Sequence, residues 1–202
     1  MQNQPLYNAI ISRRSTSKLS APAPDRDVVT LMLKAAESAP DHGRLKPWRF
    51  YVVEGEALNA LGEAYTRAST QFNTNDPKVL DKVRNMPLRA PMVIVATAVV
   101  TEGKIPEIEQ YVSVGVAIQN MQLVAEEAGF AAMWRTGGVA YDPAIKALFD
   151  LGEQDQIIGF LYLGTSDATG EPRRDPVLTQ GVSERAFCWY DAGKRAPFLK
   201  SS

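Results

Sequence analysis

The stretch Met92–Val100, MVIVATAVV, has an apolar side chain at nearly every position. Most of these residues are β-branched or small, which favours a β-strand. Side chains of a strand alternate between the two faces of its sheet, so a strand without polar positions must be covered on both faces. The stretch therefore predicts a central strand that is buried on both sides within a layered domain.

The sequence on either side of this strand predicts further strands interspersed with helices. Runs rich in β-branched and aromatic residues predict strands over residues 49–53, 131–134 and 157–163. Periodic apolar residues predict helices over residues 6–14, 57–68, 76–85 and 109–128. Because several helices are interspersed with the strands and come before the first of them, the order indicates an α+β domain rather than a repeating βαβ fold.

Two more helices begin at capping signals. Asp25 is an N-cap candidate for a helix that Pro40 ends. The apolar stripe expected on that helix consists of Val28, Leu31, Met32, Ala35 and Ala36. Asp142 and Pro143 place a cap and an N1 proline in order, which predicts a helix to about Phe149.

The longest helix candidate, residues 109–128, carries apolar side chains on most of its sides. Such a helix must be buried nearly all round. Gln119, Asn120 and Gln122 make it too polar to span a membrane. A chain of this size has little material to cover every side, so we expect a second subunit to cover part of it. Gly129 follows where a C-cap glycine is expected.

The 202 residues have an ordinary globular composition, with 45% hydrophobic and 22% charged residues. We expect one domain over residues 1–202, with an extended C-terminal arm from about residue 166. The net charge of −1 argues against a nucleic-acid partner. No apolar segment is long enough to indicate a membrane partner, and no signal-peptide pattern is visible, so a cytoplasmic location is expected.

Few residue types are available for self-sufficient catalysis. Cys188 is the single cysteine and His42 the single histidine, so neither an internal disulfide nor a zinc or iron–sulfur site is expected. The sequence has no nucleophile elbow, no Walker A loop and no dinucleotide-binding glycine motif. We therefore predict no metal site and no certain catalytic side chain, whereas redox chemistry carried by an organic cofactor stays open.

Three short stretches have ordinary structural explanations when each is taken alone. Arg13-Arg14-Ser15 follows a helix, where basic residues complement the helix dipole, although guanidinium and hydroxyl groups also suit a phosphate. Residues 39–50, APDHGRLKPWRF, are typical of a helix stop, a loop and a strand. Residues 129–138, GFAAMWRTGG, are typical of a buried strand that ends in a glycine turn.

In this order and spacing, the three stretches resemble the nitroreductase family of flavoproteins. The resemblance extends to DKVRNMPLRAP at residues 81–91 and GFLYLGT at residues 159–165, which are similar to motifs of minimal-length bacterial members. It covers roughly residues 5–165, and four motifs in register make it specific. The resemblance implies an α+β fold with a mixed β-sheet surrounded by helices. It also implies an intertwined homodimer with FMN at the subunit interface.

The resemblance assigns residues to the cofactor. The first stretch would hold the FMN phosphate, and the second would line the flavin from either subunit. The third would run past the flavin ring, with a backbone N–H of Thr136 or Gly137 bonded to flavin N5. The expected cofactor-binding residues are Arg13, Arg14, Ser15, Ser17, Ser38, Pro40, Asp41, His42, Trp134, Arg135, Thr136 and Gly137.

Two departures from the family pattern concern charge. Ser17 stands where the broader family has a basic residue, which lies near the flavin pyrimidine and stabilises the reduced flavin. Arg44 and Lys46 stand where the family has Asn and Gln, so we hypothesise that one of them restores the missing positive charge. Arg173 or Arg174 is a further candidate contact for the phosphate.

The activity implied by the resemblance is hydride transfer from NADH or NADPH, through flavin N5, to a small acceptor such as a nitroaromatic or a quinone. No motif separates NADH from NADPH. One alternative is an ene-reductase or dehydrogenase that acts on a metabolite. Others are a flavin-binding or storage protein without turnover and a cofactor-free structural dimer.

Overall fold

The computed structural model describes residues 5–68, 76–166, 187–190 and 194–197. The chain divides into two compact units, one of residues 1–13 and 170–202 and the other of residues 14–169. The smaller unit contains helix α1 (Pro5–Ser12) and an antiparallel hairpin of β6 (Phe187–Tyr190) and β7 (Lys194–Pro197). The sequence does not predict this hairpin. Much of the expected C-terminal arm lies outside the described residues, so the assignment of one domain stays a prediction.

The larger unit contains helices and strands, which confirms the α+β class. Its strands are β1 (Leu19–Ser20), β2 (Trp48–Glu54), β3 (Met92–Ala98), β4 (Ala131–Arg135) and β5 (Gln156–Ser166). Its α-helices are α2 (Arg26–Ala36), α3 (Glu56–Arg67), α4 (Pro77–Arg84), α5 (Glu107–Glu127) and α6 (Pro143–Ala147). Three short 3-10 helices join them, η1 (His42–Arg44), η2 (Pro87–Arg89) and η3 (Gly138–Tyr141).

Strand β5 is the centre of the sheet. It pairs with β3 along one edge and with β4 along the other, and its last two residues pair with β1. Strand β2 completes the sheet beside β3. All of these pairs are antiparallel, and the parallel part among the described residues is an isolated bridge between Ser15 and Ala132.

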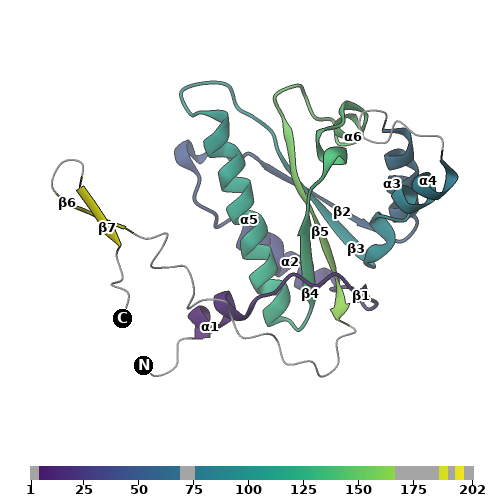
Figure 1. The fold of residues 1–202 in the computed structure, drawn as a ribbon, viewed down its shortest axis with the longest axis horizontal. Coiled ribbons are helices and arrows are strands. Elements are labelled where there is room, and N and C mark those ends of the chain that lie inside the picture. The colour runs from purple at the N-terminus through teal and green to yellow at the C-terminus, as the bar shows by residue number, and fades with distance from the viewer. Residues whose placement is uncertain (1–4, 69–75, 167–186, 191–193, 198–202) are drawn as a thin grey trace. The chain divides into compact units, whose positions relative to one another are not determined.

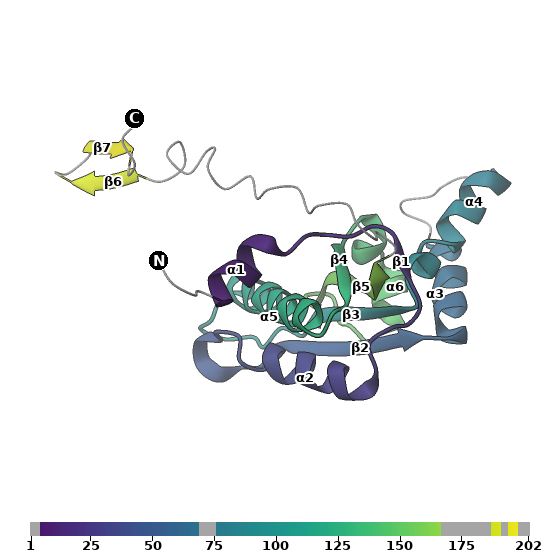
Figure 2. The same ribbon diagram turned by 90° about the horizontal axis from the view of Figure 1, so that it is seen from below.

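Helices cover both faces of this sheet. Figure 1 shows α2 and α5 on one side and α3, α4 and α6 on the other, and the turned view of Figure 2 keeps α3 and α4 apart from α2 and α5. Every residue of β3 is buried. Ile94 and Ala96 pack into the core on the α2–α5 side, whereas Val93 and Val95 pack into the core on the other side. The predicted central strand with two buried faces is therefore confirmed.

The capping signals of the sequence act as expected. The Asp25 side chain accepts a hydrogen bond from the Val28 N–H at 2.9 Å, and Asp142 accepts one from the Ala144 N–H at 2.9 Å. Each carboxylate satisfies an N–H group that has no partner within its own helix. The Asp25 and Asp142 side chains therefore fix the first turns of α2 and α6.

The apolar stripe expected on α2 is wrong at one position. Val29, Met32 and Ala36 are buried, whereas Leu31 is 56% exposed. Residues three and four apart share one helix face, but Leu31 lies about 100° around the helix axis from Met32. The buried face of α2 therefore contains Val29 in place of Leu31.

Helix α5 ends as predicted but is not covered all round. Gly129 adopts a φ of 85°, and the Phe130 N–H donates to the Ala125 carbonyl at 2.9 Å, which closes the helix. One face of α5 packs on the sheet and on α2. On the opposite face Ile108 is 63% and Val112 59% exposed. None of the described helices is long and apolar enough to cross a membrane.

The neighbouring residues Met32 and Leu31 provide a matched test of this packing. We expect Met32→Ala to lower the free energy of unfolding by about 2–5 kcal/mol, because it leaves a cavity in the core. Leu31→Ala removes an exposed side chain and should change the free energy of unfolding by no more than about 0.5 kcal/mol. Urea denaturation measures both, and equal losses in the two variants would contradict the assigned face of α2.

Candidate functional site

The first stretch of expected site residues is Arg13-Arg14-Ser15. Arg13 belongs to the smaller unit, where its N–H donates to the Ala9 carbonyl at 3.1 Å and closes α1. In the larger unit, Ser15 forms a parallel bridge with Ala132 of β4, and the Thr16 N–H donates to the Ala132 carbonyl at 3.0 Å. Arg14 and Ser15 therefore begin a segment that runs beside the strand that leads to Trp134.

Residues 40–46 of the second stretch form a largely exposed loop between α2 and β2. The Lys46 N–H donates to the Asp41 carboxylate at 2.7 Å, which holds the loop closed. His42 Nδ1 lies 2.7 Å from Glu109 Oε2, at the N-terminal end of α5. The Ser38 hydroxyl donates to the Ala35 carbonyl at 2.7 Å. These contacts fix the loop to the α2–α5 side of the sheet.

Two of the side chains at this loop share one carboxylate. The Trp48 indole N–H donates to Glu37 Oε1 at 2.7 Å, and Lys46 Nζ lies 3.2 Å from Glu37 Oε2. The hydrogen bond from Trp48, followed by that from Lys46, holds the pKa of Glu37 below its ordinary value. The Lys46 charge is thus balanced by a carboxylate of its own loop region.

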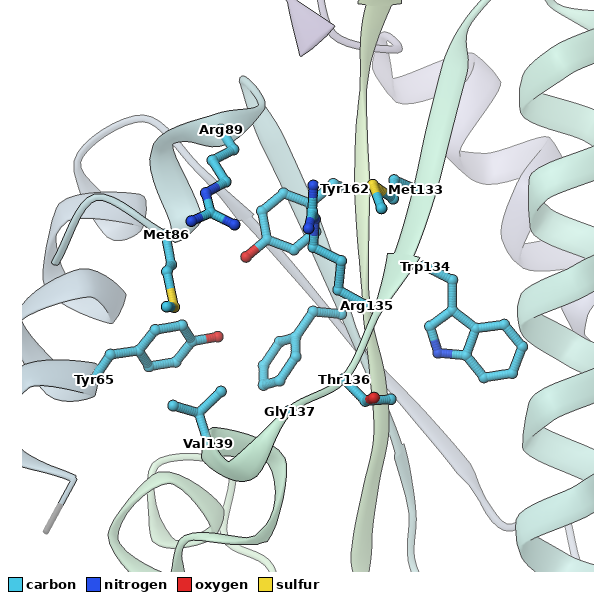
Figure 3. A pocket seen from close by; sticks show the side chains of 11 residues that line it. Tyr65, Met86, Arg89, Met133, Trp134, Arg135, Thr136, Gly137, Val139 and Tyr162 are labelled. Atoms are coloured by element: carbon cyan, nitrogen blue, oxygen red, sulfur yellow. The ribbon is translucent and has the colours of Figure 1, made fainter. Parts of the chain in front are cut away.

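The third stretch places its side chains on two sides of β4. Trp134 turns towards α5 and away from the cavity drawn in Figure 3, and its indole N–H donates to the Ile158 carbonyl at 3.3 Å. A side chain at Gly159 would collide with this indole and with the Arg135 carbonyl, so the close approach requires glycine. The Trp134 side chain therefore packs between the layers, and its expected place beside the flavin stays a prediction. Trp134 is also among the residues that line the cavity.

A cavity of about 480 Å³ lies on the other side of β4, towards α3 and η2 (Figure 3). Trp134, Arg135, Thr136 and Gly137 of the third stretch line it. None of the expected residues of the second stretch does so. The structure therefore brings one expected motif to this cavity and leaves the other with α2 and α5.

The polar side chains of the cavity are hydrogen-bond donors or hydroxyl groups, and no carboxylate of the described residues lines it. The Arg135 guanidinium lies 5.4 Å from the centre of the Tyr162 ring. Burial raises the pKa of Tyr162, and the nearby charges of Arg135 and Arg89 oppose that rise. Burial also raises the pKa of Tyr65. Two cations and two protonated phenols thus face one space.

Two polar atoms of this cavity are buried and make no hydrogen bond to any part of the chain that the structure describes. They are the hydroxyl of Tyr65, a residue only 1% exposed, and Nε of Arg135. Buried polar groups in proteins are normally paired, so unpaired ones call for a ligand or water. This pair of atoms indicates that the cavity accepts hydrogen-bond acceptors from a bound molecule.

The turn after β4 supplies backbone donors at the cavity. Gly137 adopts a φ of 117°, a conformation that suits glycine, and it caps η3. Within the described residues, the N–H groups of Thr136 and Gly137 donate to no other backbone group. Both residues are exposed. Either N–H is therefore available to an acceptor atom of a ligand.

Sequence reasoning missed three polar side chains of the cavity. Arg89 belongs to the stretch 81–91 and Tyr162 to the stretch 159–165, so both lie in motifs to which no role was assigned. Tyr65 belongs to none of these motifs. It lies among alternating polar and apolar residues of α3. The motif membership of Arg89 and Tyr162 was the signal that could have identified them.

The chain is similar to known proteins in sequence and in fold. A family model described as Nitroreductase family matches residues 10–165. Over 157 residues the chain is 40% identical to the "Putative NAD(P)H nitroreductase YdjA" of Escherichia coli (strain K12), covering 77% of this chain and 85% of that protein. The solved nitroreductase-like family protein from Bacillus cereus is 27% identical, with a TM-score of 0.71 and coverage of 85% of this chain and 91% of that chain.

A nitroreductase with bound FMN from Bacteroides fragilis NCTC 9343 shares the fold at lower sequence identity. Its TM-score is 0.67 at 20% identity, and the match covers 89% of this chain and 99% of that chain. This likeness extends over nearly the whole of that structure. It supports the layered architecture of the larger unit.

The Glu37 carboxylate leads to a pH prediction. Because its pKa is lower in the folded chain than the unfolded value of about 4.5, ionised Glu37 stabilises the fold above that pH. This stabilisation is lost as the pH falls through the folded pKa. We expect Glu37→Gln to lose less stability than the unaltered chain on acidification, as measured by urea denaturation. Glu54→Gln, at an exposed carboxylate of β2, is the control, and an unchanged pH profile in Glu37→Gln would contradict the assignment.

Proposed function

The chain belongs to the nitroreductase family, and we propose that it is an FMN-dependent oxidoreductase that uses NADH or NADPH as electron donor. A small molecule such as a nitroaromatic or a quinone is the proposed acceptor. When bound, FMN would supply the redox chemistry, by taking a hydride from the nicotinamide and passing reducing equivalents to the acceptor. The observation that carries the proposal is the cavity beside Thr136 and Gly137, with its unpaired buried donors.

The residues of this cavity fit a flavin. Its volume of about 480 Å³ lies in the range of small-molecule sites. Its apolar walls include Met133, Val139 and Phe160, which suit a flat ring system. Its polar lining, as far as the structure describes the chain, lacks acceptor carboxylates, and a flavin presents carbonyl oxygens along its pyrimidine edge. The occupant that pairs the buried donors must therefore bring acceptors, as FMN does.

The roles proposed for the expected residues follow from their elements. Arg14 and Ser15, where the segment beside β4 begins, would hold the FMN phosphate, and Arg13 keeps the phosphate role that the family resemblance implies. The free N–H of Thr136 or Gly137 would hold flavin N5 in place. Orientation of the ring by such fixed donors brings the reactants together without a side chain that moves a proton.

The loop of the second stretch points to a second copy of the chain. Ser38, Pro40, Asp41 and His42 lie with α2 and α5, on the face of the sheet away from the cavity. Ile108 and Val112 leave an apolar face of α5 exposed on the same side. We propose that a second copy covers this face, so that each FMN contacts the cavity of one chain and the loop of the other.

The relatives support the choice of cofactors. The name of the Escherichia coli relative includes NAD(P)H as donor, and the Bacteroides fragilis structure is described as containing FMN. A flavin store with the same site would bind FMN without reaction with a nicotinamide. The two functions differ in one observable, which is the reduction of bound FMN by NADH or NADPH.

The first test is the purified full chain. We expect it to be yellow and to bleach when NADH or NADPH is added without oxygen. Arg13→Ala should lose most of its FMN, because a phosphate contact is removed, while the FMN that remains should still be bleached at a similar rate. Absorbance spectra of the protein fraction measure both properties.

The matched control is Arg26→Ala, which removes an exposed arginine at the start of α2 and should keep its FMN. Full FMN occupancy in Arg13→Ala would contradict the phosphate contact. A colourless chain that takes up no added FMN would refute the proposed function as a whole. A yellow chain that neither nicotinamide bleaches would favour a flavin store.

The exposed face of α5 gives a test of the second copy. Val112→Arg places a charge in the proposed contact, so we expect the dissociation constant of the dimer to rise at least about tenfold, with parallel loss of FMN. Val79→Arg, at the exposed Val79 of α4, is the control and should leave the dimer intact. Sedimentation analysis measures both variants. A Val112→Arg chain that dimerises like the unaltered chain would exclude this face from the interface.

A further inference from the structure

Ser17 stands where the broader family has a basic residue, so positive charge near the flavin must come from another residue. Ser17 is exposed and uncharged, so it provides no cation for the pyrimidine end of a flavin. Lys46, one of the two residues expected to replace it, pairs with Glu37. Arg44, the other, is exposed in the loop, and neither lines the cavity. The cations of the cavity itself come from other elements.

Arg89 and Arg135 reach the cavity from two separate elements. Arg89 is the last residue of η2, and Arg135 is the last residue of β4. Figure 3 shows their side chains on either side of Tyr162, a residue of β5, and both charges act on the Tyr162 hydroxyl. The elements η2, β4 and β5 are far apart in sequence. Together they bring the guanidinium groups of Arg89 and Arg135 to one wall of the cavity, beside Tyr162.

This wall carries positive charge without a balancing carboxylate. Among the residues that the structure describes, neither Arg89 nor Arg135 forms an ion pair. Both are partly buried, where screening by water is weaker than at the surface. Cations held in this way favour a bound molecule that carries negative charge near them.

The donor groups of the wall match one side of a flavin. The Tyr65 hydroxyl and Arg135 Nε are buried without partners, and Figure 3 shows the Tyr65 hydroxyl directed into the space between α3 and β4. The pyrimidine ring of a flavin offers carbonyl oxygens and a nitrogen that becomes negatively charged on reduction. The protein thus supplies hydrogen-bond donors and positive charge, and the flavin supplies hydrogen-bond acceptors and negative charge.

We propose that Arg89, with Arg135 beside it, supplies the positive charge at the pyrimidine end of FMN that Ser17 cannot supply, in place of Arg44 or Lys46. This inference rests on the proposed function. A cation beside that ring favours reduced FMN over oxidised FMN, because the reduced form is the more negative one. Arg89 therefore sets the midpoint potential of the bound flavin, and Tyr65 holds the ring through a neutral hydrogen bond.

The test compares single variants of the FMN-loaded full chain. Arg89→Gln should weaken the binding of reduced FMN relative to oxidised FMN by at least tenfold, which lowers the two-electron midpoint potential by about 30 mV. Arg89→Lys keeps the charge and should restore most of the potential. Arg44→Gln and Lys46→Gln should leave it unchanged. Equilibrium titration against a redox dye measures the potential, and fluorescence titration measures the affinity for oxidised FMN.

Two more variants separate the effect of charge on the midpoint potential from the effects of a lost hydrogen bond and of a disturbed fold. Tyr65→Phe removes a donor without removing a charge, so it should weaken the binding of both redox forms similarly and leave the potential nearly constant. Arg135→Gln should shift the potential in the same direction as Arg89→Gln, which gives a second measurement if Arg89→Gln binds FMN too weakly.

The inference is overturned if Arg89→Gln and Arg135→Gln both keep the potential of the unaltered chain, or if Lys46→Gln or Arg44→Gln lowers it instead. These outcomes are distinct from failure of the proposed function, because the unaltered chain then still binds FMN and is bleached by a nicotinamide. An unaltered chain that binds no FMN refutes the proposed function and this inference together.

Discussion

The burial of β3 on both faces decides where the helices of the larger unit lie. Its alternate residues feed two separate cores, so helices must cover both sides of the sheet. Once α2 and α5 occupy one side and α3, α4 and α6 the other, the elements at the edges of the layers are divided between two faces. The loop of residues 40–47 falls on one face and the cavity of Arg135 on the other.

The two halves of the candidate site also differ in charge. The loop region is built around carboxylates, since Glu37, Asp41 and Glu109 each bind a neighbouring donor. The described residues that line the cavity include Arg89 and Arg135 and no carboxylate. Charges that are already paired within a loop bind a ligand weakly. Unpaired cations and an unpaired buried hydroxyl bind one more strongly. The physical case for an anionic or carbonyl-rich ligand therefore rests on the cavity.

Much of the fold follows from local sequence patterns. The apolar run of β3, the caps at Asp25 and Asp142 and the glycine after α5 each act through neighbours in the chain, so they are predictable. The buried face of α2 was misjudged at Leu31, because an apolar residue next to the stripe does not reveal which way the helix is turned. That rotation is decided by packing against α5 and β3.

The site was predictable only in part. Motifs identified the strand of Trp134 and the loop of Asp41, but not that Trp134 turns towards α5 or that the two motifs occupy opposite faces. Arg89, Tyr65 and Tyr162 meet because η2, α3 and β5 converge in space. No pattern along the chain encodes that meeting, so these residues required the structure.

We propose that one FMN site is built from the cavity of one chain and the loop of another. A crystal structure of the FMN-loaded protein tests it most directly. We expect two chains per assembly, with the pyrimidine ring beside Arg89 and Arg135 of one chain and the loop of Asp41 and His42 supplied by a second copy. A flavin bound wholly within one chain, or one whose pyrimidine ring lies outside the Arg89 cavity, would contradict it.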